Sequence, residues 1–234
     1  MQANRRAEIA KYYDNFLPRL LADHNGQNAR IGNVKSKIAD VLRLPVFQAE
    51  VRGEKAKILD LGCGTGITSQ FMASLGADVT AVDISPENIK AAMKLSKHKN
   101  VRYILGDITS LDLRGRKFDG IVMVDCFEHI PMTDAGDVMN SLRRHSHKNT
   151  WLYLNIPDER FQNMAKAGIP DRLQMIDETW SIGHIQSVFR QANFEMTKVE
   201  VYGIDVGCQY ASIVFSPKAD IDRGYRRFID GIGK

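Results

Sequence analysis

The chain has 234 residues, enough for one domain with a sizeable core, and 44% hydrophobic with 26% charged residues is usual for a globular protein. Its 32 basic and 28 acidic residues leave a net charge of +4, which does not indicate a dedicated nucleic-acid-binding protein. Three cysteines argue against a disulfide framework, and no apolar run approaches the length of a membrane span. No apolar signal region follows the N-terminus, so we expect a cytoplasmic protein without nucleic-acid or membrane partners.

Two amphipathic helices are predicted ahead of any strand, at residues 4–24 and 30–43. Pro45 and Gly53 then bracket a connection to the first strand. Neither helix is needed to build the sheet that follows. We therefore assign residues 1–50 to a helical cap over the ligand-binding side, with two helices packed on the back of the sheet as the alternative.

Residues 58–66, with the sequence ILDLGCGTG, indicate a short buried strand that runs into a turn containing Gly62, Gly64 and Gly66. Glycines let the backbone approach a ligand closely and adopt angles that other residues avoid. The first turn of the helix that follows directs free N–H groups to the same place. A dinucleotide-binding fingerprint would need a third glycine at the position of Ile67, which disfavours that interpretation.

From residue 57 onward, predicted strands and helices alternate. The strands are expected at 57–61, 78–82, 101–105, 118–124 and 150–156, and the helices at 67–75, 86–97 and 133–146. This alternation predicts an α/β fold, in which right-handed crossovers place helices on both faces of a parallel sheet.

The pattern loosens after Pro157. The remaining elements are a mixed insertion at 158–180, a helix at 181–192, and two long strand-like runs at 194–203 and 208–216. Two strands so close in sequence are expected to pair antiparallel. The main domain then spans residues 51–217, and residues 218–234 form a polar C-terminal tail.

Residues suited to binding an adenosine follow the predicted strands. Ligands of open parallel sheets bind beyond the carboxyl ends of the strands. Asp83, after the second strand, can accept both ribose hydroxyls, and Ile84 offers an apolar face to the adenine. Asp107 and Ile108, after the third strand, offer an acceptor for the adenine amino group and a second apolar wall.

These strand ends resemble the class I (Rossmann-like) methyltransferases that use S-adenosyl-L-methionine (SAM). The pattern from Asp60 to Gly66, the carboxylate Asp83, the triplet Gly-Asp-Ile at 106–108 and the segment 118–131 resemble the four motifs of that family. The resemblance covers residues 55–157. It implies a seven-stranded, mostly parallel sheet ending in an antiparallel hairpin, SAM as cofactor and S-adenosyl-L-homocysteine (SAH) as product.

The resemblance also assigns cofactor contacts by position. It places the first-motif residues at the cofactor, with Asp83 at the ribose, Asp107 and Ile108 at the adenine, and Asp125 near the methionine part. Those first-motif residues are Asp60, Gly62, Cys63 and Gly64. We expect Tyr13 of the cap to lie over the sulfonium, because an aromatic face attracts a cation; a tyrosine packed on the sheet is the alternative. No metal ion is expected.

The acceptor side is less defined. The resemblance implies that the insertion at 158–180 and the final hairpin shape the acceptor pocket, so we assign residues 158–180 as the acceptor-pocket insertion. The boxes typical of amino-methylating DNA enzymes, cytosine-C5 enzymes and protein arginine methyltransferases are absent. The run Glu128-His129-Ile130-Pro131 resembles enzymes that methylate small molecules, which implies an oxygen or nitrogen of a metabolite, sugar or natural-product precursor as acceptor. A hydroxyl acceptor usually needs a base. His129 is the first candidate, His184 its rival, and Glu128 a lesser one.

Two other function classes stay open at this point. A catalytically silent member of the fold would bind SAM or a partner and act by interaction. An oxidoreductase of the NAD type is disfavoured by Ile67. The sequence leaves a homodimer open.

Overall fold

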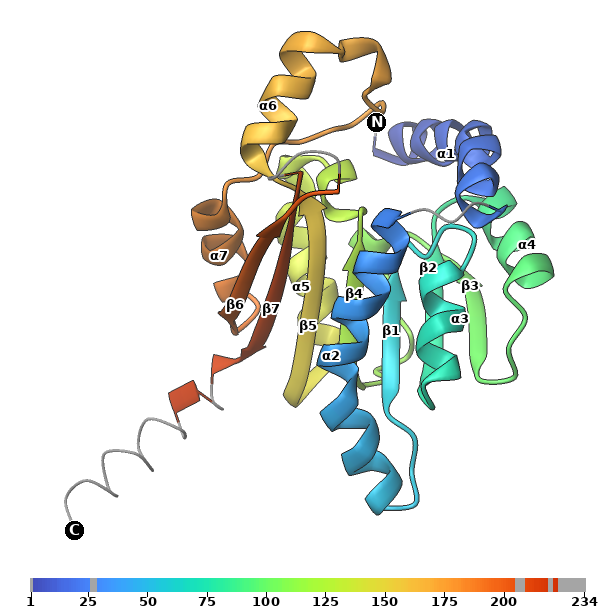
Figure 1. The fold of residues 1–234 in the computed structure, drawn as a ribbon, viewed down its shortest axis with the longest axis vertical. Helices are drawn as coiled ribbons and strands as arrows, with labels where there is room; N and C mark the ends of the chain where they lie inside the picture. The colour runs from blue at the N-terminus through green and yellow to red at the C-terminus, as the bar shows by residue number, and fades with distance from the viewer. Residues whose placement is uncertain (1, 26–28, 205–208, 219–220, 223–234) are drawn as a thin grey trace.

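A seven-stranded sheet forms the centre of the protein in the computed structural model, which describes residues 2–25, 29–204, 209–218 and 221–222 (Figure 1). The strands are β1 (Lys57–Leu61), β2 (Asp78–Asp83), β3 (Val101–Leu105), β4 (Phe118–Val124), β5 (Ser146–Pro157), β6 (Phe194–Tyr202) and β7 (Tyr210–Pro217). Their spatial order is β3-β2-β1-β4-β5-β7-β6. Strands β1 to β5 run parallel, and β7 pairs antiparallel with both β5 and β6. The predicted fold class is confirmed.

The strand order fixes where a ligand can bind. From β1 the chain adds β2 and β3 on one side, and then returns to add β4 on the other side of β1. The crossovers on the two sides of this point diverge, which opens a crevice beyond the carboxyl ends of β1 and β4.

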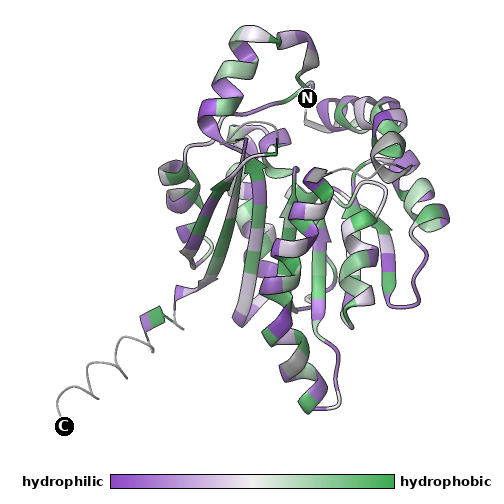
Figure 2. Cartoon of the chain, in the orientation of Figure 1, coloured by the Kyte–Doolittle hydropathy of each residue, from purple (hydrophilic) through white to green (hydrophobic). Residues whose placement is uncertain are grey.

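The helices are α1 (Gln2–Asn25), α2 (Ala29–Val51), α3 (Ile67–Ser74), α4 (Pro86–Leu95), α5 (Ala135–His145), α6 (Glu159–Gly168) and α7 (Ile182–Arg190). Successive residues of a strand point to opposite faces, so Ile58 packs in one core cluster and Leu59 in the other. Helices α2, α3 and α4 cover the first face, and α5 and α7 cover the second. The strands between the two layers are mostly hydrophobic (Figure 2).

Helix α2 differs from its prediction in length and in role. Its residues Val34, Ile38, Leu42 and Val46 are buried in the core cluster that also contains Ile58 of β1 and Tyr153 of β5, at the spacing that places side chains on one face of a helix. Pro45 lies inside the helix and does not end it. Proline in a helix interior is costly, and the burial of Val46 and Ala49 beyond it accounts for the continuation. The alternative of a helix packed on the sheet is therefore correct for α2.

Helix α1 lies over the carboxyl ends of the strands and has the place of a cap (Figure 1). Asp14 fastens it to α4, because its carboxylate accepts hydrogen bonds from Ser85 Oγ at 2.6 Å and from the Glu87 backbone N–H at 3.1 Å. Among the residues whose burial the structure describes, none of α1 belongs to the buried core. The cap is thus held at its edges by polar contacts.

The insertion after β5 lies at the same end of the sheet as α1 (Figure 1). It begins with α6, whose N-cap Asp158 accepts a hydrogen bond from the Arg160 backbone N–H at 3.0 Å. Most of the predicted tail, residues 218–234, lies outside the described residues. None of the helices in the described ranges is long and apolar enough to cross a bilayer.

Candidate active site

A cavity of about 450 Å³ opens at the crevice beyond β1 and β4. It brings together eleven of the thirteen residues that the sequence singled out. They are Tyr13, Gly62, Cys63, Gly64, Asp83, Ile84, Asp107, Ile108, Asp125, Glu128 and His129. The two exceptions are Asp60 and His184.

The glycine loop needs glycine for two separate reasons. Gly62, Gly64 and Gly66 have φ values of 74°, 53° and 80°, in the left-handed region that glycine adopts without strain. A Cβ atom at Gly62 would also lie 2.3 Å from Cys126 Sγ. The loop therefore packs against the segment after β4, and its backbone faces the cavity.

Asp60 lies beneath this loop and does not line the cavity, so the direct cofactor contact expected for it is not seen. It shares the sheet face of Ile58, where its carboxylate accepts hydrogen bonds from Thr68 Oγ1 at 3.1 Å and Ser69 Oγ at 2.5 Å. Burial raises the pKa of Asp60 to about 6. Its bonds tie the end of β1, just before the loop, to the start of α3, which makes Asp60 a positioning residue.

Asp83 is held in one orientation by three donors. Its carboxylate accepts hydrogen bonds from the Gly64 backbone N–H at 2.8 Å, the Ser85 backbone N–H at 2.9 Å and Asn88 Nδ2 at 3.2 Å. Burial raises the pKa of Asp83, and these donors oppose that rise. Asn88 Oδ1 is buried and has no hydrogen-bond partner among the described residues. A carboxylate and a free amide oxygen at one wall suit a ligand that donates hydroxyl groups.

Asp107 lines the part of the cavity next to β3. One carboxylate oxygen accepts hydrogen bonds from the Thr109 backbone N–H at 2.9 Å and from Thr109 Oγ1 at 2.7 Å. The other lies 3.1 Å from Arg6 Nε, so the cap contributes a cation to this wall. Ile108 and Ile84 add apolar surface.

Asp125 follows β4 with a left-handed φ of 47°. Its carboxylate accepts hydrogen bonds from Arg30 Nη1 and, at 2.8 Å, from Asn155 Nδ2. Since Arg30 belongs to α2 and Asn155 to β5, one carboxylate joins three elements at the cavity. This arrangement fixes the segment that carries Glu128 and His129.

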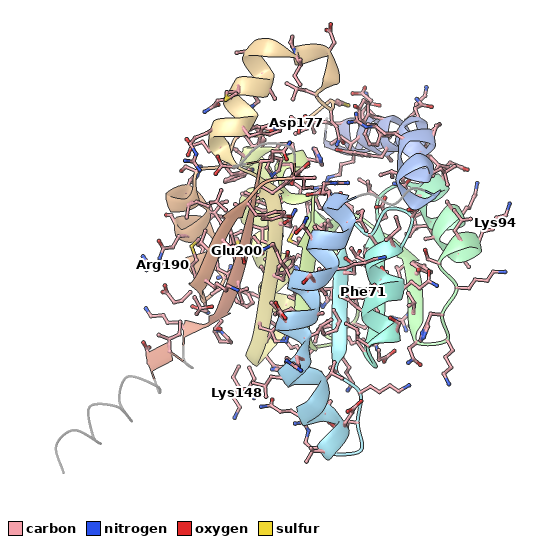
Figure 3. All side chains as sticks on the ribbon, in the orientation of Figure 1. Phe71, Lys94, Lys148, Asp177, Arg190 and Glu200 are labelled. Atoms are coloured by element: carbon pink, nitrogen blue, oxygen red, sulfur yellow. The ribbon has the colours of Figure 1, made fainter. Side chains whose placement is uncertain are left out.

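His129 has the geometry of a base. Its Nδ1 lies 2.7 Å from the Ile176 carbonyl oxygen and 3.4 Å from Asp177 Oδ1. A ring nitrogen beside two acceptors carries the proton in the neutral imidazole, so Nε2 keeps its lone pair. Burial lowers the pKa of His129, and the bond to Ile176 and the charge of Asp177 oppose this change. Figure 3 places Asp177, a residue of the insertion, between α6 and α1.

Glu128 is buried beside His129, with Oε1 at 3.8 Å from His129 Nε2. Its Oε2 has no hydrogen-bond partner among the described residues. Burial raises the pKa of Glu128 to about 8. The raised pKa keeps the side chain protonated to a higher pH than an ordinary carboxyl group, which disfavours Glu128 as the base.

This raised pKa predicts a pH-dependent stability. A carboxyl group whose pKa rises on folding contributes stability that is present below its unfolded pKa and is lost as the pH rises through the folded one, here between about 4.5 and about 8. Glu128→Gln removes this titration. As the pH rises across this range, we expect the free energy of unfolding of the wild type to fall by about a few kcal/mol more than that of the variant. Urea unfolding at both ends of the range measures it. The exposed Glu159→Gln is the matched control, and a parallel pH dependence in wild type and Glu128→Gln would contradict the prediction.

His184 does not reach the cavity, so its role as a rival base is not supported. It lies exposed on α7 with its ring 4.8 Å from that of Trp180. Tyr13 lines the cavity from α1, with its ring 6.0 Å from that of His129. Its hydroxyl is buried and has no hydrogen-bond partner among the described residues, and its contact with a sulfonium stays a prediction.

The cavity is also lined by residues that belong to no sequence motif. They are Arg6 and Arg30 from the cap and α2, and Gln162, Gln174 and Asp177 from the insertion. No signal in the sequence distinguishes them from other polar residues. In the part of the chain that the structure describes, no group of three or more His, Cys, Asp and Glu side chains is placed to hold a metal ion.

The sheet order, with the glycine loop and the strand-end carboxylates around one cavity, is the Rossmann-like fold of the class I methyltransferases. Residues 58–149 match the family model described as a methyltransferase domain, which confirms the resemblance found in the sequence.

Curated relatives are ubiquinone biosynthesis O-methyltransferases. The one from Xanthomonas axonopodis pv. citri is 31% identical over 135 residues, which is 56% of this chain and 56% of the relative. The one from Xanthomonas campestris pv. campestris (strain B100) is 37% identical over 93 residues, 38% of this chain and 39% of the relative. The chain spans about half the length, or less, of the curated relatives it matches.

Solved structures match over more of the chain. Magnesium protoporphyrin IX methyltransferase from Synechocystis PCC 6803, with bound SAH, has a TM-score of 0.67 at 16% identity, and the match covers 90% of this chain and 99% of that one. The 1,6-didemethyltoxoflavin-N1-methyltransferase from Burkholderia thailandensis has a TM-score of 0.65 at 18% identity, with 92% and 88% covered. At these identities the likeness shows the fold.

Proposed function

We propose that the protein transfers a methyl group from SAM to a hydroxyl group of a small-molecule acceptor. One observation carries this proposal: the glycine loop, Asp83, Asp107 and His129 line a single cavity. The first three suit a nucleoside-bearing cofactor, and His129 suits removal of a proton from an acceptor.

Three parts of the cavity wall would hold SAM. The Asp83 carboxylate accepts the ribose hydroxyls, with Asn88 Oδ1 as a further acceptor. Ile84 and Ile108 face the adenine. The loop with Gly62 and Gly64 lets the backbone lie against the methionine part. SAM, when bound, supplies a methyl group on a positively charged sulfur, from which an oxygen or nitrogen can displace it in line.

The acceptor's proton would pass to His129 Nε2. The Nδ1–H group of His129 donates to the Ile176 carbonyl, which keeps Nε2 unprotonated and fixes the ring. Since burial lowers the pKa of His129, the imidazole is neutral at physiological pH and ready to accept a proton. Tyr13 and Phe16 of α1 line the cavity, where they would exclude water from the reacting atoms.

A base of this kind supports an oxygen acceptor over a nitrogen acceptor. A hydroxyl must lose a proton as it attacks, whereas an amine that arrives unprotonated needs no base. The curated relatives are named O-methyltransferases. The toxoflavin enzyme of similar fold is named an N-methyltransferase, so the fold alone does not decide the acceptor atom.

Asp83→Ala tests the cofactor assignment. The substitution should remove charge-assisted hydrogen bonds to the ribose, each worth about 1.5–3 kcal/mol. It also frees the Gly64 N–H and so loosens the loop. We expect the SAM affinity, measured by isothermal titration, to fall at least about tenfold while the circular dichroism spectrum is kept. Asp112→Ala, outside the cavity, is the control. Unchanged SAM affinity in Asp83→Ala would remove Asp83 from the ribose site.

The activity is tested by incubating the protein and methyl-labelled SAM with a native extract and finding the labelled product by mass spectrometry. Titration with SAM, SAH and NAD separates the remaining alternatives. Binding of SAM without any labelled product would favour the silent member of the fold. Binding of NAD in preference to SAM would favour an oxidoreductase.

The same proposal includes a SAM-binding domain at residues 51–217 with α1 as its cap. It also includes a cytoplasmic location. The three cysteines support a reducing compartment. A homodimer stays a prediction, to be measured by sedimentation.

A further inference from the structure

Three buried polar atoms without a hydrogen-bond partner among the described residues belong to the cavity wall that the segments after β4 and β5 form. They are Glu128 Oε2, Gln162 Nε2 and Gln174 Oε1. The side chains of Glu128 and Gln162 are 2% and 4% exposed. Folded proteins leave few buried polar atoms unpaired, because each has lost its hydrogen bonds to water. Three such atoms on one wall indicate a ligand that completes their hydrogen bonds.

This wall is distinct from the one that suits the nucleoside. Apart from Tyr13 and Asp125, the residues assigned to SAM belong to or follow β1, β2 and β3, on one side of the sheet order. Glu128 follows β4, and Gln162 and Gln174 belong to the insertion after β5, on the other side. Figure 1 shows α6, which carries Gln162, standing beyond β5 and away from β2 and β3. His129 lies beside Glu128, so a ligand on this wall is within reach of the proposed base.

The electrostatics of the cavity limit what this ligand can be. Two of its arginines, Arg6 and Arg30, are in ion pairs with Asp107 and Asp125. Arg19 is exposed and lies over the Phe16 ring at 5.2 Å. Asp177 adds a further carboxylate next to His129. The wall itself is made of amides and a carboxyl group whose pKa is raised to about 8, so it offers hydrogen bonds without a cation for a carboxylate ligand.

We propose that Gln162 and Gln174, together with Glu128, form the acceptor subsite and select an uncharged acceptor with at least two hydroxyl or carbonyl groups. The inference rests on the proposed function and names its substrate class. A glutamine amide both donates and accepts, so Gln162 Nε2 would bind an acceptor oxygen and Gln174 Oε1 would accept from an acceptor hydroxyl. Ile130 and Pro131 line the cavity nearby and cover the apolar part of such a molecule.

Binding of three matched probes to the full-length protein saturated with SAH tests this subsite. The probes are phloroglucinol, an uncharged ring with several hydroxyls; its trimethyl ether, which has no donor; and the trihydroxybenzoate that adds a carboxylate to the same ring. Saturation-transfer NMR titrations give their affinities. We expect phloroglucinol to bind at least about tenfold more tightly than either of the others.

Glutamine-to-methionine variants assign the effect to residues. Gln162→Met and Gln174→Met keep the side-chain length and remove the polar atoms. Each should weaken phloroglucinol binding at least about fivefold and leave SAH affinity unchanged. The exposed Gln191→Met, outside the cavity, is the matched control. Because each change removes an unpaired buried atom, the ligand-free variants should melt at or above the wild-type temperature.

The outcomes separate this inference from the proposed function. Tight binding of the trihydroxybenzoate, wild-type phloroglucinol affinity in both methionine variants, or no binding of any probe to the SAH complex would each overturn the subsite. A wild-type protein that fails to bind SAH contradicts the proposed function itself.

Discussion

Replacing His129 with alanine should lower turnover at least about a hundredfold while SAM affinity stays at the wild-type value. In the neutral imidazole the proton is on Nδ1, which lies 2.7 Å from the Ile176 carbonyl oxygen. Nε2 therefore keeps its lone pair and can accept a proton. No contact of His129 is needed to hold a nucleoside, so cofactor binding should not change. Turnover with labelled SAM at saturation and isothermal titration measure the two quantities.

The pH dependence gives a second readout of the same residue. A base works only when it is unprotonated, so kcat/KM should fall as the pH falls through the pKa of His129. Burial lowers that pKa, which places the acid limb below the ordinary value of 6.5. The limb should be absent in His129→Ala. A pH profile that keeps its acid limb in the variant would assign the titration to another group.

His184→Ala is the matched control because His184 is exposed on α7 and outside the cavity. We expect wild-type turnover and an unchanged pH profile from it. Should His129→Ala also keep normal turnover, the acceptor needs no base, and an unprotonated amine becomes the acceptor to test. The pair of variants thus decides between an oxygen and a nitrogen acceptor.

The sequence predicted the cofactor side of the cavity because its residues follow strands directly. A strand, a turn and a helix are adjacent in the chain, and parallel strands bring their carboxyl ends to one edge of a sheet. The places of Asp83, Asp107 and His129 therefore follow from local pattern. Asp60 is the informative exception: it is the last residue but one of β1, and the alternation of side chains turns it to the face of Ile58 and away from the cavity.

The rest of the site depends on contacts between segments that are far apart in the chain. Arg30 forms an ion pair with Asp125 although the two residues are 95 positions apart in the chain, and no sequence pattern in either segment predicts this pair. The same holds for Ile176, whose backbone carbonyl orients His129 and has no signature in the sequence. The role of α2 was missed for a related reason, since an apolar helical stripe does not say which surface it covers.

Removing α1 should abolish turnover while the remaining chain still folds. The apolar side chains of Ile9, Tyr13, Phe16 and Leu20 line the cavity from above, and Leu20 Cδ1 would lie 3.6 Å from a Cβ at Gly64. Closure by these groups keeps water from the reacting atoms, and the Tyr13 ring is placed where it can attract a sulfonium. Without them we expect turnover of a chain that begins after residue 24 to fall at least about a hundredfold.

The core should survive this truncation because, among the residues whose burial is described, both core clusters are built from α2 onward. Circular dichroism and a cooperative urea transition check the fold.

Asp14→Ala offers a milder test of the cap, since it removes only the bonds to Ser85 and Glu87 that fasten α1 to α4. It should raise KM for SAM more than it lowers kcat, because the cap then opens without being lost; Asn15→Ala, exposed on the same helix, is its control. Full turnover in the truncated chain would show that α1 does not close the site, and it would leave Tyr13 as a residue of the cavity wall without a part in the reaction.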